Sequence, residues 1–227
     1  MPVLEARGVR KVYRGDGVET EALRGVDLAV ERGEFTALVG PSGSGKSTLL
    51  HLLAGLDVPT EGEVFLDGVR VDRLSRAARA RLRLEKVGLV FQAYNLLPVL
   101  TALENAAFVL ELRGVPRRER EEKALAALAA LGLKDKAHRY PRQLSGGEQQ
   151  RVAVARALAA EPLVVLADEP TANLDSRSGL ALVERMKALN RELGVTFLLA
   201  THDPRLLEHV GRIVRMEDGR VVGEERL

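Results

Sequence analysis

The sequence has no cysteine and no tryptophan, and aromatic residues make up only 4% of its 227 positions. Without cysteine, the protein can have no disulfide framework, no cysteine-ligated zinc and no thiol nucleophile. No apolar run approaches the roughly 20 residues that a membrane-spanning helix requires, and the first residues lack a basic start followed by an apolar signal core. We therefore expect any work at a membrane to be done through a partner.

An excess of charge of one sign is also absent. Lys and Arg total 34 against 32 for Asp and Glu, the formal net charge is +2, and both signs are interspersed along the chain. Such a mixed surface gives no reason to expect a nucleic-acid partner. Hydrophobic residues, at 46%, can build a substantial core. The composition therefore predicts a globular protein in which residues 1–227 form one domain with a subdomain inside it.

The order of apolar patterns and turn residues predicts an α/β fold. The expected strands are residues 3–13, 22–30, 35–39, 62–71 (a hairpin turning at 67–68), 87–91, 163–167, 196–200 and 213–222 (a hairpin turning at 218–219). The expected helices follow residue 45 and cover 101–131 with a break at 114–116, 146–159 and 178–193. The first three strands predict a meander with a turn at 15–17. In the second half, apolar strands alternate with helices, which is typical of parallel strands covered on both faces.

Residues 40–47 match the phosphate-binding loop pattern in full, directly after an expected strand and directly before an expected helix. The glycines let backbone N–H groups converge on phosphate oxygens, and the helix N-terminus adds the positive end of its dipole. Lys46 is expected to reach the β- and γ-phosphates, and the Ser47 hydroxyl to ligate Mg²⁺. The alternative is a glycine- and serine-rich loop without a ligand. The candidate nucleotide-binding residues here are Gly40, Pro41, Ser42, Gly43, Ser44, Gly45, Lys46, Ser47 and Thr48.

The apolar strand expected at 163–167 ends in two carboxylates, Asp168 and Glu169. Enzymes with parallel sheets bind their ligands at this end of the strands. Asp168 is expected to hold Mg²⁺ through water, and Glu169 to orient or deprotonate an attacking water. Taken alone, such a pair could equally cap a helix. Together with the phosphate-binding loop, it indicates a nucleotide hydrolase.

Residues 144–151, Leu-Ser-Gly-Gly-Glu-Gln-Gln-Arg, form the most specific pattern in the chain. Ser145 and Glu148 match a capping box for the helix that follows, which is a purely structural explanation. Capping does not require Gly146 and Gly147, whereas a helix N-terminus that approaches a phosphate needs glycine and free N–H groups. The segment resembles the signature motif of the ABC ATPases, and both explanations can hold together.

The resemblance to the ABC ATPases extends over nearly the whole chain and implies roles for further residues. Tyr13 resembles the aromatic residue that stacks on adenine, and Gln92 the glutamine that links the Mg²⁺ site to the helical subdomain. Asp175 ends a segment, 172–175, that resembles the family's D-loop at the nucleotide, and His202 resembles its switch histidine. Each of these residues alone has a structural explanation, as packing or as a solvated group. Their order favours the site, with Lys46, Gln92, Glu169 and His202 as catalytic residues and Ser47, Gln92 and Asp168 as metal ligands.

Within this family, the sequence is most similar to the lipoprotein-releasing, macrolide-exporting and cell-division ATPases. The similarity rests on residues 55–62, 91–98 and 101–105, although Thr101 and Glu104 also match a capping box. Ala172 departs from the glycine usual in that group. Because the chain stops at Leu227, we expect no fused membrane domain.

The resemblance implies a phosphate-loop α/β fold with a parallel core sheet, an N-terminal antiparallel β subdomain and a helical subdomain at about 93–160. It also implies an ATPase that binds ATP and Mg²⁺ as a homodimer. Each ATP would lie between one chain's phosphate loop and the other chain's Ser145 and Gly147. The dimer would drive a separate transmembrane permease from the cytoplasmic face of the cell membrane, for lipoprotein release or export.

Three alternative functions compete with this interpretation. A cell-division ATPase would signal across the membrane without moving cargo, and the sequence hardly separates it from a transporter. Soluble ABC ATPases of DNA repair, chromosome maintenance or translation need zinc-binding cysteines, a long coiled-coil insertion or a second cassette, which this sequence lacks. A small-molecule kinase or GTPase with a phosphate loop does not explain residues 145–151.

Overall fold

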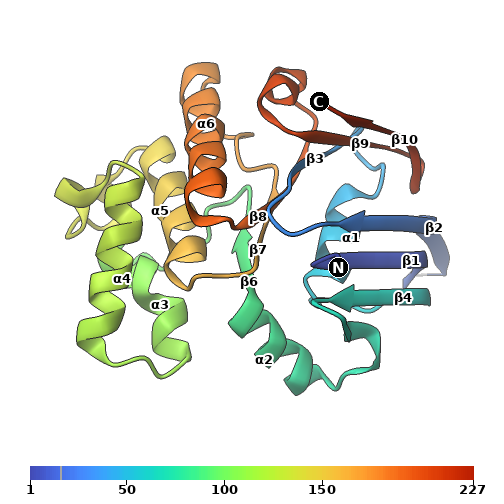
Figure 1. Ribbon diagram of the computed structural model, residues 1–227, viewed down its shortest axis with the longest axis horizontal. Coiled ribbons are helices and arrows are strands. Elements are labelled where there is room, and N and C mark those ends of the chain that lie inside the picture. The colour runs from blue at the N-terminus through green and yellow to red at the C-terminus, as the bar shows by residue number, and fades with distance from the viewer. Residues whose placement is uncertain (16) are drawn as a thin grey trace.

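Two β-sheets and six α-helices build the part of the protein that the computed structural model describes, residues 1–15 and 17–227 (Figure 1). The strands are β1 (Leu4–Gly15), β2 (Val18–Val30), β3 (Phe35–Val39), β4 (Glu61–Leu66), β5 (Val69–Arg70), β6 (Val87–Val90), β7 (Val164–Asp168), β8 (Thr196–Thr201), β9 (Arg212–Glu217) and β10 (Arg220–Arg226). The helices are α1 (Lys46–Leu53), α2 (Arg76–Lys86), α3 (Ala102–Leu112), α4 (Arg117–Ala130), α5 (Gly146–Ala159) and α6 (Ser176–Leu193).

The larger sheet has the strand order β10-β9-β3-β8-β7-β6, and its neighbouring strands are parallel except for the pair β9 and β10. Every residue of β3 and β8 is buried. Because side chains along a strand alternate between faces, Ala37 and Phe197 pack with α5 and α6, while Leu38 and Leu198 pack with α1 and the smaller sheet. The predicted parallel sheet covered on both faces is confirmed.

The smaller sheet is antiparallel, with the order β2-β1-β4-β5, and confirms the predicted N-terminal β subdomain. The predicted meander is wrong in its third strand, because β3 leaves this sheet and pairs in parallel with β8 and β9. The physical reason is that all five residues of β3 are buried, which only a strand inside a sheet covered on both faces provides. The turn predicted at 15–17 includes Asp16, which lies outside the described residues.

Two tight turns form where Asp-Gly pairs predict hairpins. Asp67 and Gly68 have φ values of 51° and 75°, and Asp218 and Gly219 have φ values of 45° and 74°. Two successive residues with positive φ are required by the hairpin turn whose twist matches that of the strands, and Asp-Gly adopts it readily. Both predicted hairpins, β4 with β5 and β9 with β10, are confirmed.

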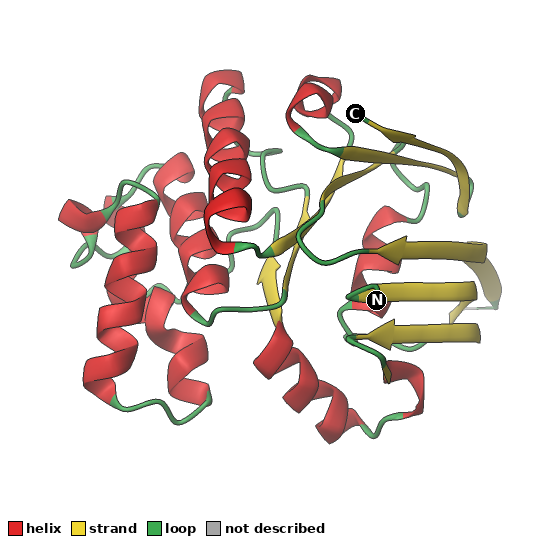
Figure 2. Ribbon diagram, in the orientation of Figure 1, coloured by secondary structure: helices red, strands yellow, loops and turns green. Residues whose placement is uncertain are grey.

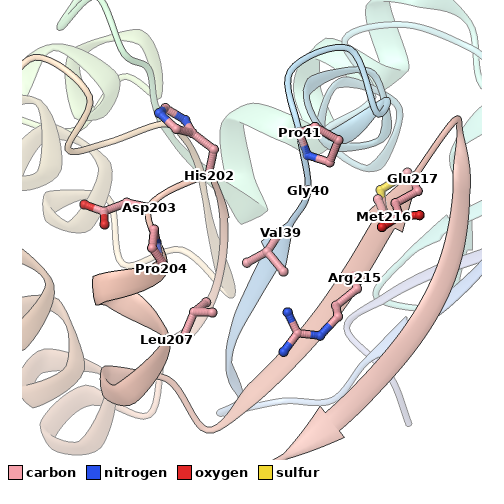
Figure 3. A pocket seen from close by; sticks show the side chains of 10 residues that line it. All are labelled: Val39, Gly40, Pro41, His202, Asp203, Pro204, Leu207, Arg215, Met216 and Glu217. Atoms are coloured by element: carbon pink, nitrogen blue, oxygen red, sulfur yellow. The ribbon is translucent and has the colours of Figure 1, made fainter.

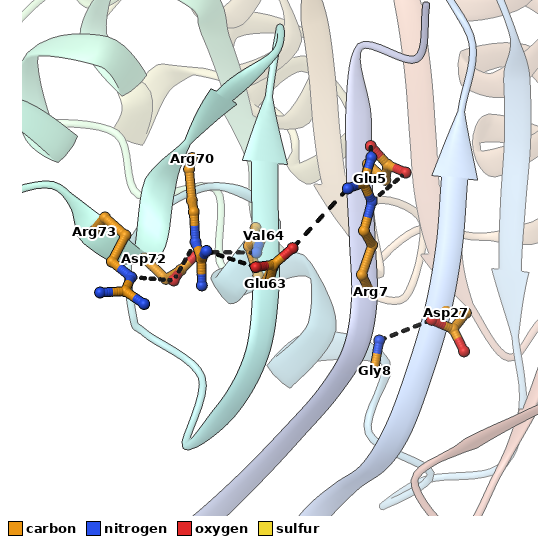
Figure 4. A network of polar contacts seen from close by, with 9 residues as sticks. All are labelled: Glu5, Arg7, Gly8, Asp27, Glu63, Val64, Arg70, Asp72 and Arg73. Carbon is orange, nitrogen blue, oxygen red and sulfur yellow. Dashed lines mark hydrogen bonds and ion pairs between the residues drawn. The ribbon is translucent and has the colours of Figure 1, made fainter.

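Paired charges cover one region of the smaller sheet (Figure 4). Arg7 contacts Glu5 at 2.7 Å and lies 4.0 Å from Glu63, which in turn contacts Arg70 at 2.5 Å. Arg70 also contacts Asp72 at 3.0 Å. Exposed pairs of this kind contribute little stability each, about 0 to 1 kcal/mol. Their alternating signs agree with the mixed charge pattern of the sequence.

The helices α3, α4 and α5 gather at the end of the molecule away from the antiparallel sheet (Figure 2). The predicted break is confirmed: α3 ends at Leu112, Gly114 has a φ of 75°, and Pro116 precedes the first turn of α4. Sequence patterns did not predict α2, because no residue of this Arg-rich helix is buried and its only large apolar residues, Leu82 and Leu84, are two positions apart. Within residues 1–15 and 17–227, no helix is both long and apolar enough to span a bilayer.

Candidate active site

A cavity of about 700 Å³ opens where the strands of the parallel sheet end. Most of its lining comes from residues that follow four strands: the loop 41–48 after β3, Gln92 after β6, Glu169 after β7 and His202 after β8. Parallel strands bring their carboxyl ends to one edge of the sheet, so segments distant in sequence meet there. The predicted site residues that line this cavity are Tyr13, Pro41, Ser42, Gly43, Gly45, Lys46, Ser47, Thr48, Gln92, Glu169 and His202.

The phosphate-binding loop is a tight turn that packs against its neighbours. Gly43 and Gly45 have φ values of 81° and 99°, which L side chains rarely adopt. A Cβ at Gly45 would lie 2.6 Å from the Ala22 carbonyl oxygen, so this position also needs glycine for space. The Lys46 ammonium donates to the carbonyls of Gly40 and Pro41 at 2.8 and 3.0 Å, which holds its charge at the loop.

Ser47 and Asp168 supply the oxygen atoms that suit a magnesium ion. The Ser47 hydroxyl donates to an Asp168 carboxylate oxygen at 2.9 Å, although 121 positions separate the two residues. A hydroxyl, a carboxylate and phosphate oxygens form the kind of donor set that Mg²⁺ takes when it binds with a nucleotide. Among the described residues, no group of three or more His, Cys, Asp or Glu side chains could hold a metal ion.

Glu169 and His202 form a direct pair at the edge of the cavity. The His202 Nδ1 lies 2.9 Å from a Glu169 carboxylate oxygen, and the Glu169 side chain is only 16% exposed. The backbone of Glu169 has a φ of 47°, and its N–H donates to the Ala200 carbonyl at 2.9 Å. A left-handed conformation is uncommon for glutamate, and such conformations concentrate at functional sites. Here it turns the carboxylate from the end of β7 toward His202.

Tyr13 presents a partly exposed ring to the cavity and is held by two neighbours. Its hydroxyl donates to Asp57 at 3.2 Å, and the Lys11 ammonium lies 4.8 Å from the ring centre. Partial burial raises the pKa of the Tyr13 hydroxyl, and the negative charge of Asp57 raises it further. Tyr13 is 41% exposed, and its ring lines the cavity, where a flat ligand could stack on it.

Several residues at this site were not predicted from the sequence. Thr20, Glu21 and Ala22, all of β2, line the cavity, and Lys11 and Asp57 hold Tyr13. The three β2 residues belong to no motif. The pairing of β1 with β2 brings them beside Tyr13, and Asp57 reaches Tyr13 from the segment between α1 and β4.

The signature residues and Asp175 lie outside the cavity of their own chain. Ser145, Gly146, Gly147 and Asp175 are absent from its lining in the described residues. Ser145 accepts from the Glu148 N–H at 3.3 Å and forms the capping box of α5. Asp175 caps α6 by accepting from the Ser178 N–H at 3.0 Å. The structure therefore confirms the capping explanations and does not bring these residues to the phosphate loop of the same chain.

A second cavity of about 260 Å³ adjoins the first. Figure 3 shows His202 and Pro204 on one side of it and Val39, Gly40 and Pro41 on the other. It therefore shares His202 and the start of the phosphate loop with the larger cavity.

Such a fold and site define a phosphate-loop nucleotide hydrolase. Residues 23–172 match the ABC transporter family, and the chain belongs to this family. It is therefore an ATP-binding cassette with ATPase activity, as the resemblance of its motifs implied.

Relatives match nearly the full length of the chain. An uncharacterized ABC transporter ATP-binding protein of Thermotoga maritima is 49% identical over 224 residues, which cover 99% of this chain and 95% of that protein. The lipoprotein-releasing system ATP-binding protein LolD of Aquifex aeolicus is 47% identical over 222 residues, covering 98% and 97%. The predicted likeness to lipoprotein-releasing ATPases is confirmed.

Solved structures extend the likeness to the fold. A bacterial ABC transporter cassette solved as a dimer matches with a TM-score of 0.91 at 42% identity, covering 99% of this chain and 98% of that one. A dimeric cassette in a post-hydrolysis state, bound to ADP and Pi, matches with a TM-score of 0.90 over the same shares of the two chains.

Proposed function

We propose that this ATPase forms a homodimer on binding ATP and drives a transmembrane permease that releases or exports lipoproteins. It would act at the cytoplasmic face of the cell membrane, held there by the permease. The observation that carries the proposal is the 47% identity to a lipoprotein-releasing ATP-binding subunit over nearly all of both chains. Support for the dimer comes from two solved structures of one relative, MJ0796, both of which are dimeric.

The chemistry follows from the contacts at the cavity. Lys46 and the N–H groups of the loop would hold the β- and γ-phosphates, and Mg²⁺ held by Ser47, Asp168 and Gln92 would neutralise charge on them. Glu169 would hold the attacking water and accept its proton. His202 faces Glu169 through Nδ1, which leaves its other ring nitrogen for the γ-phosphate.

A second copy of the chain would complete each site. Ser145 and the N–H groups at the start of α5 carry the positive end of a helix dipole but lie outside the cavity of their own chain. In a dimer with twofold symmetry, the start of α5 in each chain faces the cavity of the other chain, so two equivalent sites form. Ser145, Gly146 and Gly147 of one chain would then contact the γ-phosphate held by the other, with Asp175 beside them.

The permease would dock in a groove of about 470 Å³ formed by α2, β6, α3 and α5. Its walls are largely apolar, and Leu112 at its rim is 58% exposed. Phe91 and Asn95, which lie before and after Gln92 in the sequence, also line this groove. We infer that residues 93–160 form a helical subdomain that passes movement between this groove and the nucleotide.

Glu169→Gln tests the nucleotide half of the proposal. The variant should bind Mg-ATP but hydrolyse it at least about a hundredfold more slowly, because it loses the proton acceptor and keeps the phosphate contacts. ATP should then shift the variant from monomer to dimer in size-exclusion chromatography, while ADP should not. Lys46→Ala is the matched control and should remain monomeric with ATP. A Glu169→Gln protein that binds ATP and stays monomeric would contradict the proposed dimer.

Leu112→Asp tests the docking groove. A charge in an apolar contact opposes burial, so we expect this variant to recover much less permease in affinity purification from the organism's own membranes. Leu193→Asp places the same charge on another exposed leucine, 63% exposed at the end of α6, and should recover the permease normally. Equal recovery by both variants would place the permease elsewhere.

A further inference from the structure

The segment 91–95 carries Gln92 into the active-site cavity, and side chains from outside the segment hold it in place. It lies outside the strands and helices, between β6 and α3. Gln150 of α5 donates to the Phe91 carbonyl at 3.3 Å, and Asn173 donates to the Gln92 carbonyl at 3.0 Å. The two carbonyls nearest the Gln92 side chain are therefore fixed from outside the segment.

Arg156, also of α5, holds the other end of the segment. Its guanidinium donates to the Asn95 carbonyl at 2.6 Å and to the Tyr94 carbonyl at 3.0 Å. Asn95 has a φ of 52°, a left-handed conformation that asparagine adopts more readily than most residues. Burial lowers the pKa of Arg156, and none of the ion pairs among the described residues includes it. The buried guanidinium therefore replaces its hydrogen bonds to water mainly with these two hydrogen bonds to carbonyls.

Gln150 connects the same helix to the catalytic carboxylate. It is 1% exposed, and its amide also donates to the Pro170 carbonyl at 2.6 Å, directly after Glu169. Its amide oxygen is buried and accepts no hydrogen bond among the described residues. A buried polar group with an unmet partner costs free energy. An alanine or leucine would avoid this cost, so the contacts to Phe91 and Pro170 are the evident function of the side chain.

At its N-terminal end, α5 touches the same segment again. A Cβ built on Gly146 would lie 2.8 Å from the Tyr94 hydroxyl, so that hydroxyl sits directly against the signature glycine. The segment thus follows α5 from Gly146 to Arg156, beside β6 (Figure 1). Any displacement of α5 must displace the segment, because three side-chain contacts and one close packing contact join them.

We propose that Gln150 and Arg156 are positioning residues that fix Gln92 to α5. This inference rests on the proposed function, in which Gln92 serves the chain's own ATP and the start of α5 serves the partner's. Through these two residues, the position of Gln92 at one nucleotide and the position of Ser145 to Gly147 at the other change together. The two sites of the dimer are thereby coupled through α5.

A double-mutant cycle with Gln92 tests the proposal. Gln92→Ala should lower kcat, and Arg156→Met, which keeps the apolar stem, should lower kcat about tenfold with KM for ATP changed less than about twofold. In the Gln92→Ala background, Arg156→Met should change kcat less than about twofold, because residues that act through one another are not additive. Arg156→Lys keeps a donor and should give an intermediate kcat in the wild-type background only.

Arg113 offers a matched control. It directly follows α3, its pKa is lowered by burial as that of Arg156 is, and it also donates to carbonyls, those of Leu84 and Glu85 at 2.8 Å and Ala160 at 2.6 Å. None of these bonds reaches residues 91–95. Arg113→Met should therefore lower thermal stability as Arg156→Met does, and should alter kcat by less than about twofold in either background.

Different results would overturn the positioning role of Arg156 and the role of Gln92 itself. A fall in kcat from Arg156→Met that is equal in both backgrounds, or that Arg113→Met reproduces, overturns the positioning role. Full kcat in Gln92→Ala alone overturns the proposed role of Gln92 and this inference with it. The kcat of the single variant Gln92→Ala therefore distinguishes a failure of the proposed function from a failure of the positioning role.

Discussion

At Tyr13, the contacts around one ring decide what the side chain can do. The hydroxyl is bound by Asp57 and the Lys11 ammonium lies over the ring, yet the ring lines the nucleotide cavity. Tyr13→Ala should weaken nucleotide binding by about 1 to 3 kcal/mol, the usual contribution of stacking on a base. Tyr13→Phe should bind nearly as well as the wild type, because it keeps the ring. Equal losses in both variants, measured by titration calorimetry, would mean that Asp57 and the hydroxyl, not stacking, are what matter.

Single residues also show how far the sequence predicts the site. Lys46 and Ser47 follow from a local pattern, because the loop and helix that place them are continuous in sequence. The contact of Ser47 with Asp168 and that of Glu169 with His202 depend on strand order, which no spacing encodes. The same is true of Lys11, whose ammonium contacts Asp57 and lies over the Tyr13 ring.

Two helices offer a matched comparison at the scale of the element. Thr101 of α3 and Ser145 of α5 form the same capping box, accepting from the N–H three residues on at 3.2 and 3.3 Å. Thr101→Ala and Ser145→Ala should each lower the free energy of unfolding by about 1 kcal/mol. Only Ser145→Ala should also impair ATP-dependent dimerisation of the Glu169→Gln protein. If both variants dimerise normally, Ser145 is a cap and nothing more.

Elements with a strong local signal were predicted well. The bounds of α5 match the expected 146–159, because a capping box marks its start and buried residues recur along it. The sequence places β3 in the wrong sheet. An apolar strand of five residues fits either the antiparallel or the parallel sheet, and only its pairing with β8 shows which one it joins. α2 is not predicted from the sequence because its only large apolar residues, Leu82 and Leu84, are two positions apart, which is not a helical spacing.

At the scale of the whole molecule, one chain supplies only part of each ATP site in the proposed dimer. One chain gathers the phosphate loop, Asp168, Glu169 and His202, and holds Ser145 to Gly147 apart from them. The loops that follow the parallel strands meet at one edge of the sheet. The start of α5 adjoins Tyr94 and Leu174 in two of these loops but lies outside the cavity of its own chain. The central claim is therefore that each ATP is held between two copies of the chain.

Disulfide formation between two single-cysteine proteins tests that claim most directly, because the natural chain has no cysteine. Ser42→Cys and Ser145→Cys suit the test, since both serines are exposed, whereas a side chain at Gly146 would meet the Tyr94 hydroxyl. Each change is combined with Glu169→Gln, and the two proteins are mixed under mild oxidation. Our account predicts a covalent dimer containing one copy of each protein, formed with ATP and not with ADP. The absence of that product with ATP, while both proteins still bind nucleotide, would contradict it.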